Sequence, residues 1–403
     1  MYIETLGELF RQYRKKQHIT MNELQEKIGI NKGVISKLEN GETKRPELKT
    51  MFTISDALHI PLHEVIYRYV EVEKRPTMLH EVLVKSIKLG NNMDLIKTVT
   101  LAYLSSDRHE TEDALATLYE FTSTIHTQEI QLVLYNSITE YARLRGIPPF
   151  IAKGLLQIYF ITRLDLHTKE KTFDKAKEIL YYIDFLSHAE KILFYFRMTL
   201  HAYGIKKYEQ SIAFCKKGLL LETEDTELRA KAHGTLINAY FELQEYEEVE
   251  KHLNQFEHYK HDFIHECALY TRAIVKVKKK EYEIAIPLLE KTLNEISKPQ
   301  RLYVANELLT IYTELHHQEA MQKLFSKEEA ILSFLEHPEA TNEQLNIGMY
   351  YEFKGNFQMN QGQIDEAMSS YTKSMETYEK INATEEMNAL QYKIILQTLC
   401  INR

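Results

Sequence analysis

The stretch from residue 29 to residue 46 reads GINKGVISKLENGETKRP and decides the organisation of the first part of this 403-residue chain. Gly29 can supply a tight turn between two helices, and Asn31 can cap the second of them. Apolar residues then follow at helical spacing, namely Val34, Ile35 and Leu38. Asn40 and Gly41 can end this helix. The stretch therefore predicts a short helix that is entered through a tight turn and ended at a second glycine.

Further short helices on both sides of this stretch complete a small helical unit. The first has apolar residues at helical spacing, namely Leu6, Leu9, Phe10 and Tyr13. Thr20 followed by Glu23 is a capping-box pattern and predicts a second helix, which leads into the turn. Pro46 and Pro61 precede two more apolar segments. Two short helices that meet at a glycine turn, within a unit of five, form the layout of a helix-turn-helix DNA reader.

The charge of the chain is unevenly divided. The formal net charge is −8, but residues 1–70 hold 11 Lys and Arg against 9 Asp and Glu, while the remainder holds 39 against 49. The only basic part therefore coincides with the predicted DNA reader, which favours contact with an anionic polymer there and not elsewhere.

The quoted run, with its flanking helices, resembles the Xre and phage-repressor family of DNA-binding domains over roughly residues 4–66. One departure is Met21, because the family usually has Gln at the first helical position after the Thr or Ser cap. The resemblance implies that the third helix enters the major groove of double-stranded DNA. It also implies a structural ion pair between Arg14 and Glu39, which would join the first and third helices.

Within that resemblance, a few exposed positions are expected to contact the DNA operator. The implied DNA-binding residues are Asn31, Lys32, Gly33, Ser36, Lys37, Asn40, Lys44 and Arg45. Lysine can donate to guanine O6 and N7, whereas the last three positions are expected to hold the phosphate backbone. The alternative interpretation is that these charges form only a solvated face.

The rest of the chain contains an internal repeat. A bulky residue three positions before a small one recurs as Phe173 and Ala176, Tyr208 and Ser211, Tyr246 and Val249, Tyr282 and Ala285, His317 and Ala320, and Ile364 and Ala367. Successive pairs begin 35, 38, 36, 35 and 47 residues apart, with two amphipathic helical segments around each. A period near ~34 residues with two helices per unit is typical of tetratricopeptide repeats. The last unit fits best, with Gly355 at the small position of its first helix and Gly362 at its turn.

Such repeats stack into a superhelix with a concave surface. When each small residue above is taken as the packing position of a second helix, seven polar residues fall on the inward face of a first helix: Arg197, Thr235, Asn238, Thr271, Asn306, Asn356 and Asn360. Asparagine carries both donors and an acceptor, so spaced asparagines can pair with the backbone of an extended peptide. The alternative is that they are ordinary solvent-facing polar residues.

A helix-turn-helix joined to degenerate tetratricopeptide repeats resembles the peptide-pheromone regulators of Gram-positive bacteria, the RRNPP group that includes PlcR, NprR, PrgX and Rap proteins. The resemblance implies an all-α fold: a five-helix, lambda-repressor-like domain at 1–68, a linker at 69–80, and a tetratricopeptide-like right-handed α-superhelix at 81–403. It further implies a cytoplasmic homodimer that regulates transcription in quorum sensing and binds a short signalling peptide in its concave groove.

Two other functions remain open from the residues. One is a peptide-blind repressor whose repeats only dimerise or bind a protein partner, and the other is a bifunctional regulator that also binds a phosphorelay protein, as Rap relatives do. We expect no enzyme activity, cofactor or metal, because no HExxH or CxxC-type context occurs. No apolar run is long enough to span a membrane. Cys215, Cys267 and Cys400 are expected to be core thiols.

Overall fold

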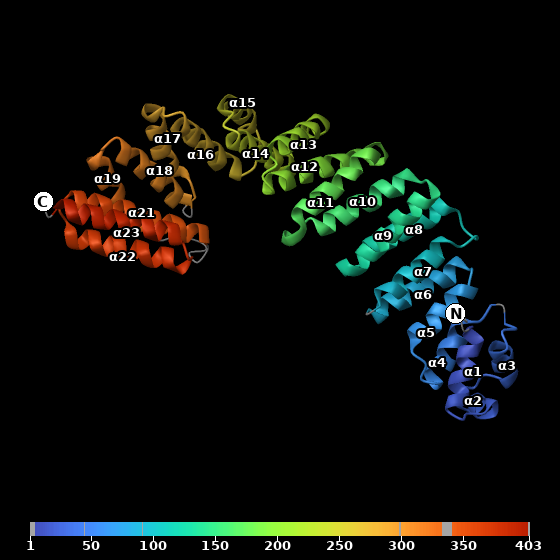
Figure 1. Ribbon diagram of the computed structural model, residues 1–403. Coiled ribbons are helices and arrows are strands. Elements are labelled where there is room, and N and C mark those ends of the chain that lie inside the picture. Colours follow the sequence, from blue (N-terminus) through green and yellow to red (C-terminus); the bar gives the residue numbers. More distant parts are fainter. Residues whose placement is uncertain (1–4, 44, 91, 298–299, 333–340, 402–403) are drawn as a thin grey trace. The chain divides into compact units, whose positions relative to one another are not determined.

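The computed structural model describes residues 5–43, 45–90, 92–297, 300–332 and 341–401 (Figure 1). Every regular element in these ranges is a helix, which confirms the all-α class predicted from the sequence. The chain divides into two compact units, Met1–Phe194 and Tyr195–Arg403, called unit 1 and unit 2 below. Within the described ranges, no helix combines the length and the apolar character needed to cross a membrane.

Unit 1 opens with the five short helices expected from the sequence. They are α1 (Leu6–Lys16), α2 (Met21–Ile28), α3 (Lys32–Glu39), α4 (Leu48–Ala57) and α5 (Leu62–Val72). Thr20 and Glu23 form the predicted capping box at the start of α2. Gly29 ends α2 with φ of 71°, a left-handed conformation that costs glycine little. The Asn31 side chain then accepts a hydrogen bond from the backbone N of Gly33 and caps α3.

A buried ion pair holds α1 against α3. Arg14 donates through Nε and Nη2 to the two carboxylate oxygens of Glu39, each at 2.6 Å, and through Nη1 to the backbone oxygen of Ile19 at 3.0 Å. The hydrogen bond to Glu39 raises the pKa of Arg14. Both side chains are buried, so Arg14 would be an uncompensated charge without Glu39. The pair expected from the sequence therefore holds α1 against α3 inside the domain.

The segment 69–80, predicted to be a linker, is instead mostly helical. Only residues 73–75 lie between α5 and α6 (Pro76–Leu89). The carboxylate of Glu73 is buried there and accepts from the backbone N of Arg75 at 2.7 Å, from Nη2 of the same residue at 2.6 Å and from the Tyr69 hydroxyl at 2.8 Å. Burial raises the pKa of Glu73, but the hydrogen bonds from Arg75 and Tyr69 outweigh it and lower the pKa to about 2. This junction is held by a charged cluster and does not behave as an extended linker.

The remainder of unit 1 consists of further helices. They are α6, α7 (Met93–Leu104), α8 (Thr111–Ser123), α9 (Gln128–Arg145), α10 (Pro148–Thr162), the short η1 (Leu166–Thr168), α11 (Lys169–Ala176) and η2 (Lys177–Phe185), followed by α12 (His188–Gly204), which contains the division between the units. Phe173, predicted to start a repeat helix, lies inside α11, where it is buried. The first repeat therefore does not begin where the sequence pattern placed it.

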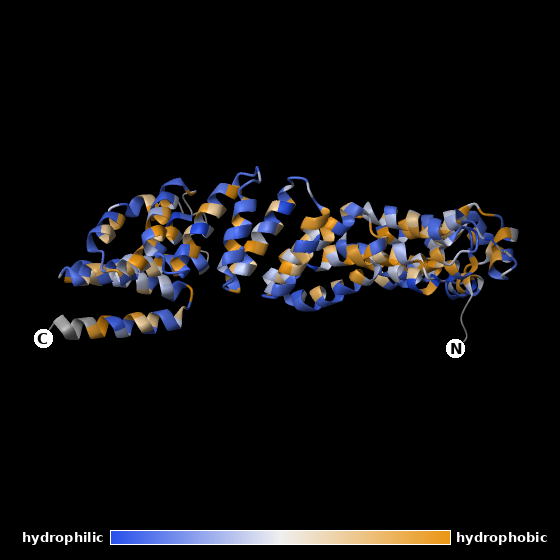
Figure 2. Ribbon diagram, turned by 90° about the horizontal axis from the view of Figure 1, so that it is seen from above, coloured by the Kyte–Doolittle hydropathy of each residue, from blue (hydrophilic) through white to orange (hydrophobic). Residues whose placement is uncertain are grey.

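Unit 2 is built from pairs of helices. They are α13 (Tyr208–Leu221), α14 (Glu227–Glu242), α15 (Tyr246–Phe256), α16 (Phe263–Lys278), α17 (Tyr282–Glu295), α18 (Arg301–Glu314), α19 (Gln318–Phe325), α20 (Glu328–Leu332), α21 (Thr341–Asn360), α22 (Ile364–Lys380) and α23 (Thr384–Ile401). Each helix carries both hydrophobic and hydrophilic residues (Figure 2). The predicted repeat starts Tyr208, Tyr246, Tyr282 and Ile364 are the first residues of α13, α15, α17 and α22.

A left-handed residue precedes the second helix of each of these pairs. Lys206, Gln244 and Lys280 have φ of 58°, 60° and 58°, and each lies two residues before the helix that follows. His316 has φ of 55°, and α19 accordingly begins two residues later, at Gln318. The predicted start at His317 is therefore one residue too early. The buried packing position of α19 is Met321, not Ala320.

The last pair shows how closely the helices approach one another. A Cβ added to Gly355 of α21 would lie 2.5 Å from the ring of Tyr371 in α22. A Cβ added to Gly348 would lie 2.3 Å from the ring of Tyr378. Both tyrosines are fully buried. Only glycine therefore lets α22 pack on α21 at this distance.

Of the three cysteines expected to be core thiols, Cys215 is buried as expected and Cys267 is not. Cys215 is buried, and its thiol donates to the backbone oxygen of Ala232 at 3.3 Å. Cys267 is exposed. The side chain of Cys400 lies outside the described residues.

Candidate DNA-reading surface and ligand groove

Helix α3 presents a polar face away from the core of its domain. Ile35 and Leu38 point into the core, whereas Lys32, Gly33 and Lys37 are exposed and Ser36 is half-buried. The backbone N of Lys32 donates to Oε1 of Gln25 at 2.8 Å, which ties the start of α3 to α2. Lys32, Gly33, Ser36 and Lys37, which the resemblance places near the base edges of DNA, thus share the outward face of one anchored helix.

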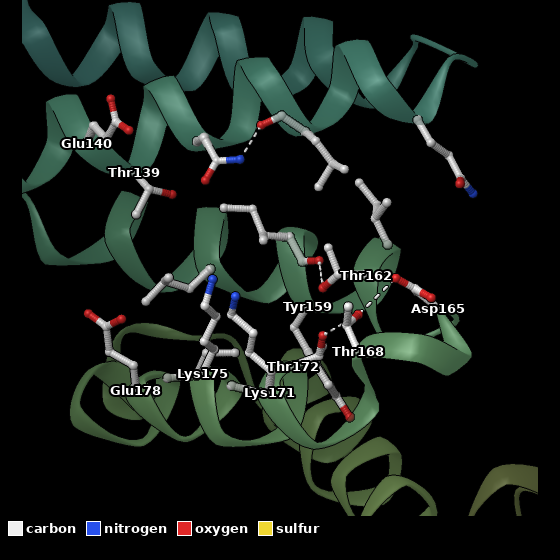
Figure 3. A pocket seen from close by; sticks show the side chains of 18 of the residues that line it. Thr139, Glu140, Tyr159, Thr162, Asp165, Thr168, Lys171, Thr172, Lys175 and Glu178 are labelled. Atoms are coloured by element: carbon white, nitrogen blue, oxygen red, sulfur yellow. Dashed lines mark hydrogen bonds between the residues drawn. The ribbon is translucent and has the colours of Figure 1, made fainter.

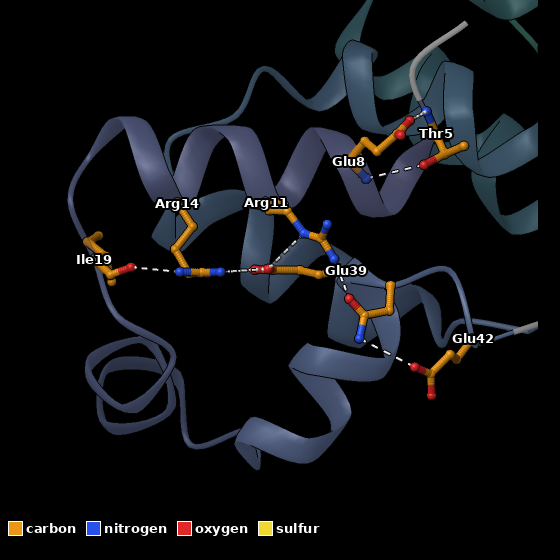
Figure 4. A network of polar contacts seen from close by, with 8 residues as sticks. Thr5, Glu8, Arg11, Arg14, Ile19, Glu39 and Glu42 are labelled. Atoms are coloured by element: carbon orange, nitrogen blue, oxygen red, sulfur yellow. Dashed lines mark hydrogen bonds and ion pairs between the residues drawn. The ribbon is translucent and has the colours of Figure 1, made fainter.

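A polar network joins this face to α1 (Figure 4). Arg11 donates to Oδ1 of Asn40, and its Nε lies 3.8 Å from a carboxylate oxygen of Glu39. The Asn40 amide donates to Glu42 at 3.3 Å. Asn40, expected to hold a phosphate, is therefore positioned by a guanidinium and faces a carboxylate. Arg11 was missed at the sequence level, although it lies three residues before Arg14 on the same helix.

The other two expected phosphate contacts, Lys44 and Arg45, follow α3 in the sequence. Arg45 is exposed. Lys44 lies outside the described residues. Val34 is exposed as well, with 46% of its surface accessible, and it is the one apolar side chain that α3 leaves in solvent. An exposed valine on such a helix can contact a thymine methyl group.

Unit 2 contains a groove of about 630 Å³ between the first helices of consecutive pairs. It is lined mainly by α14 and α16, with smaller contributions from α12, α15 and α18. Its apolar wall is formed by Ile237, Phe241, Phe256, Phe263, Tyr270 and Ile274. Its polar lining includes Thr235, Asn238, Thr271, Lys278 and Glu307. The groove can therefore bury apolar groups while offering a few hydrogen-bonding positions.

Three of the seven residues expected to bind a peptide line this groove: Thr235, Asn238 and Thr271. Asn238 is exposed and has no hydrogen-bond partner among the described residues, so its amide is available to a ligand. Thr235 donates to the backbone oxygen of Lys231 within its own helix at 2.9 Å.

Asn306 does not line the groove. It is buried, and its amide donates to the backbone oxygen of Asn346 in α21 at 2.9 Å. The reason is the one-residue shift at α19. The groove-facing position of a first helix lies 14 residues before the buried packing residue of the helix that follows. For the packing residue Met321 this position is Glu307 and not Asn306. Burial raises the pKa of Glu307, and the charge of Lys278 opposes this rise. The groove therefore contains a carboxylate that the sequence pattern had not identified.

The remaining expected peptide contacts lie outside this groove. Arg197 of α12 is half-buried. Asn356 accepts a hydrogen bond from the Tyr371 hydroxyl at 2.9 Å, so it serves the packing of α21 on α22. Asn360 is exposed at the last residue of α21. Of the four asparagines expected to contact a peptide, only Asn238 lines the groove.

A buried pair of histidines lies beside the groove. Nε2 of His233 and Nδ1 of His252 are 3.0 Å apart, and Nδ1 of His233 is 3.2 Å from the Tyr259 hydroxyl. The His233 ring also stands edge-on to Phe256, which lines the groove. Burial, followed by the nearby charges of His252 and Arg229, lowers the pKa of His233 to about 4. The described residues hold no group of three or more His, Cys, Asp or Glu that could bind a metal.

Comparison with known proteins identifies the first domain. Residues 10–65 match the family described as "Helix-turn-helix". They form a helix-turn-helix domain. The chain is also 28% identical over 95 residues to the HTH-type transcriptional repressor RghR of Bacillus subtilis (strain 168), an alignment that covers 23% of this chain and 70% of the relative. The chain therefore carries a DNA-binding domain of the kind found in transcription regulators.

Two solved structures are similar over a larger share of the chain. One is a Rap protein complexed with Competence and Sporulation Factor, with 13% identity, a TM-score of 0.38, and coverage of 86% of this chain and 98% of that one. The other is Bacillus thuringiensis PlcR in complex with the peptide PapR7 and DNA, with 15% identity, a TM-score of 0.24, and coverage of 68% and 99%. Because both TM-scores are low, the all-α fold is assigned from the helices described above and not from these two similarities.

We expect the exposed face of α3 to determine sequence-specific binding. Lys32→Ala or Lys37→Ala should weaken binding to an operator selected in vitro by about 1–3 kcal/mol and leave binding to random DNA nearly unchanged. Arg45→Ala should weaken binding to all sequences similarly and flatten the salt dependence. Fluorescence anisotropy at several salt concentrations measures both effects, with exposed Lys88→Ala of α6 as the control. Wild-type operator affinity for Lys37→Ala would show that α3 is not the reading helix.

The histidine pair predicts a loss of stability in mild acid. The pKa of His233 falls from 6.5 to about 4 on folding, so between these values the unfolded chain binds more protons than the folded chain. The free energy of unfolding therefore has its full value above pH 6.5, where His233 is neutral in both states. It decreases as the pH falls, by up to about 3 kcal/mol. Urea unfolding between pH 7.5 and 4 should show a smaller pH dependence for His233→Gln than for wild type. Exposed His126→Gln is the control, and identical pH profiles for His233→Gln and wild type would contradict the assignment.

Proposed function

We propose that this chain is a transcription regulator whose helix-turn-helix reads DNA and whose unit 2 binds a short signalling peptide that controls DNA binding. The proposal rests on the equivalent positions of three residues in successive helix pairs. Thr235, Thr271 and Glu307 each lie 14 residues before a buried packing residue, and all three line one groove. A row of equivalent positions on successive helices suits an extended ligand, because such a ligand repeats its own backbone groups at a regular interval.

The chemistry of the groove favours a peptide with apolar side chains. The free amide of Asn238 can donate to a peptide carbonyl and accept from a peptide N–H. The aromatic wall around Phe241 and Phe263 can bury apolar side chains. The carboxylate of Glu307 can pair with a basic side chain or an amino terminus. A volume of about 630 Å³ accommodates several residues of such a ligand.

A homodimer is part of this proposal. One helix-turn-helix contacts few bases, so useful specificity requires two of them on half-sites about one helical turn, ~34 Å, apart. Helix α23 leaves Tyr392, Ile395 and Leu396 exposed at 65%, 57% and 45%. These side chains support self-association through the end of unit 2, because a monomer gains nothing from exposing them together.

Peptide binding to the groove is tested by calorimetry on the full chain. The probes are short synthetic peptides taken from small secreted reading frames beside the gene. Asn238→Ala should weaken binding of a peptide that binds by about 1 kcal/mol, since it removes hydrogen bonds to the peptide backbone. Asn360→Ala is the matched control, because this asparagine is exposed but does not line the groove.

The outcome separates the proposal from a regulator that senses no peptide. If none of these peptides binds, or if Asn360→Ala costs as much affinity as Asn238→Ala, the groove is not a peptide sensor. Unit 2 would then serve only dimerisation or a protein partner.

A further inference from the structure

Unit 1 contains a second cavity, far along the chain from the DNA-reading helix and not part of the groove in unit 2. It has a volume of about 650 Å³ and lies between α9, α10 and the segment from η1 to η2 (Figure 3). Aliphatic side chains form much of its lining, namely Leu132, Leu155, Ile158, Ile161 and Ile179. A cavity with this lining can bury an apolar group.

The acidic groups at this cavity already have partners. Glu178 pairs with Arg143 at 2.6 Å, Glu140 pairs with Lys97 at 3.0 Å, and Asp165 accepts from the backbone N of His167 and the hydroxyl of Thr168, both at 2.9 Å. These contacts neutralise the carboxylates or satisfy their oxygens. None of the three carboxylates is paired with a lysine of α11.

Two lysines of α11 remain without a carboxylate. Lys171 and Lys175 lie one helical turn apart, and their side chains extend side by side into the cavity (Figure 3). Neither makes an ion pair within the described part of the chain. Like charges at this spacing repel one another, so an anion placed between them would remove an unfavourable interaction as well as make a favourable one. Thr172, on the same helix, adds a hydroxyl to the lining.

We propose that this cavity binds a small organic anion: an oxyanion head, carboxylate or phosphate, attached to an apolar body. The head lies between the ammonium groups of Lys171 and Lys175, and the body lies against the aliphatic lining around Leu155 and Ile158. The charge pattern favours an anion, because Lys171 and Lys175 are the only cations lining the cavity in the described residues that make no ion pair, whereas the unpaired carboxylate of Asp165 already accepts from the backbone N of His167 and the hydroxyl of Thr168. This site is separate from the peptide proposed for unit 2.

The test uses calorimetry on the full chain with octanoate and octyl phosphate as probes. Acetate and inorganic phosphate are the controls for the head alone, and octylammonium is the control for the apolar body with the opposite charge. We expect octanoate or octyl phosphate to bind more tightly than any control. The variant Lys171→Gln/Lys175→Gln should weaken that binding by about tenfold or more, whereas exposed Lys88→Gln of α6 should not. Thermal melting of the variant establishes that its fold is retained.

A second measurement needs no substitution. Acetylation of lysines in the wild-type chain, followed by mass spectrometry, should show Lys171 and Lys175 protected by the anionic probe and Lys88 unaffected. The proposal is overturned if octylammonium binds as tightly as octanoate, if the double variant keeps wild-type affinity, or if the two lysines are labelled equally with and without the probe. Equal binding of acetate and octanoate would contradict the role of the aliphatic lining.

Discussion

The close approach of paired helices is the constraint on which unit 2 depends. In the last pair, Gly348 and Gly355 each face a buried tyrosine ring at a distance that no larger residue permits. Polar contacts complete the same interface, because the Ser374 hydroxyl donates to the backbone oxygen of Gly348 at 2.8 Å and the Tyr371 hydroxyl donates to Asn356. An asparagine that would otherwise be a plausible ligand contact is thereby committed to holding two helices together.

The same constraint fixes which side chains face the groove. A left-handed residue sets where each second helix begins, and the buried packing residue then sets the rotation of the pair. Since an α-helix turns about 100° per residue, an offset of one residue moves a different side chain into the groove. At α19 the left-handed residue is His316, and the groove accordingly receives Glu307 and not Asn306. The groove gains an acidic group whose charge can select a ligand.

Local patterns in the sequence predicted the helix-turn-helix well. The capping box at Thr20 and the glycine turn at Gly29 act within a few residues, so their geometry can be inferred without the rest of the chain. Contacts between distant residues could not be inferred in this way. The span 69–80 was predicted to be a linker, but most of it is helical, and the backbone oxygen of Lys74 accepts a hydrogen bond from the hydroxyl of Ser106, far along the chain, at 2.7 Å. The repeat was identified from its period. Its register at α19 depends on the left-handed conformation of His316, which a histidine in the sequence does not predict.

The central claim is that one chain couples DNA reading to a ligand in the groove of unit 2, and the most direct test is a linkage measurement. The operator affinity of the full chain is measured with and without a saturating groove peptide, and the peptide affinity is measured with and without operator. Coupling requires both affinities to change by the same factor, typically about 5- to 150-fold. We predict equal factors well above one. If the peptide binds and both factors equal one, DNA reading and the groove are independent, and the account is contradicted.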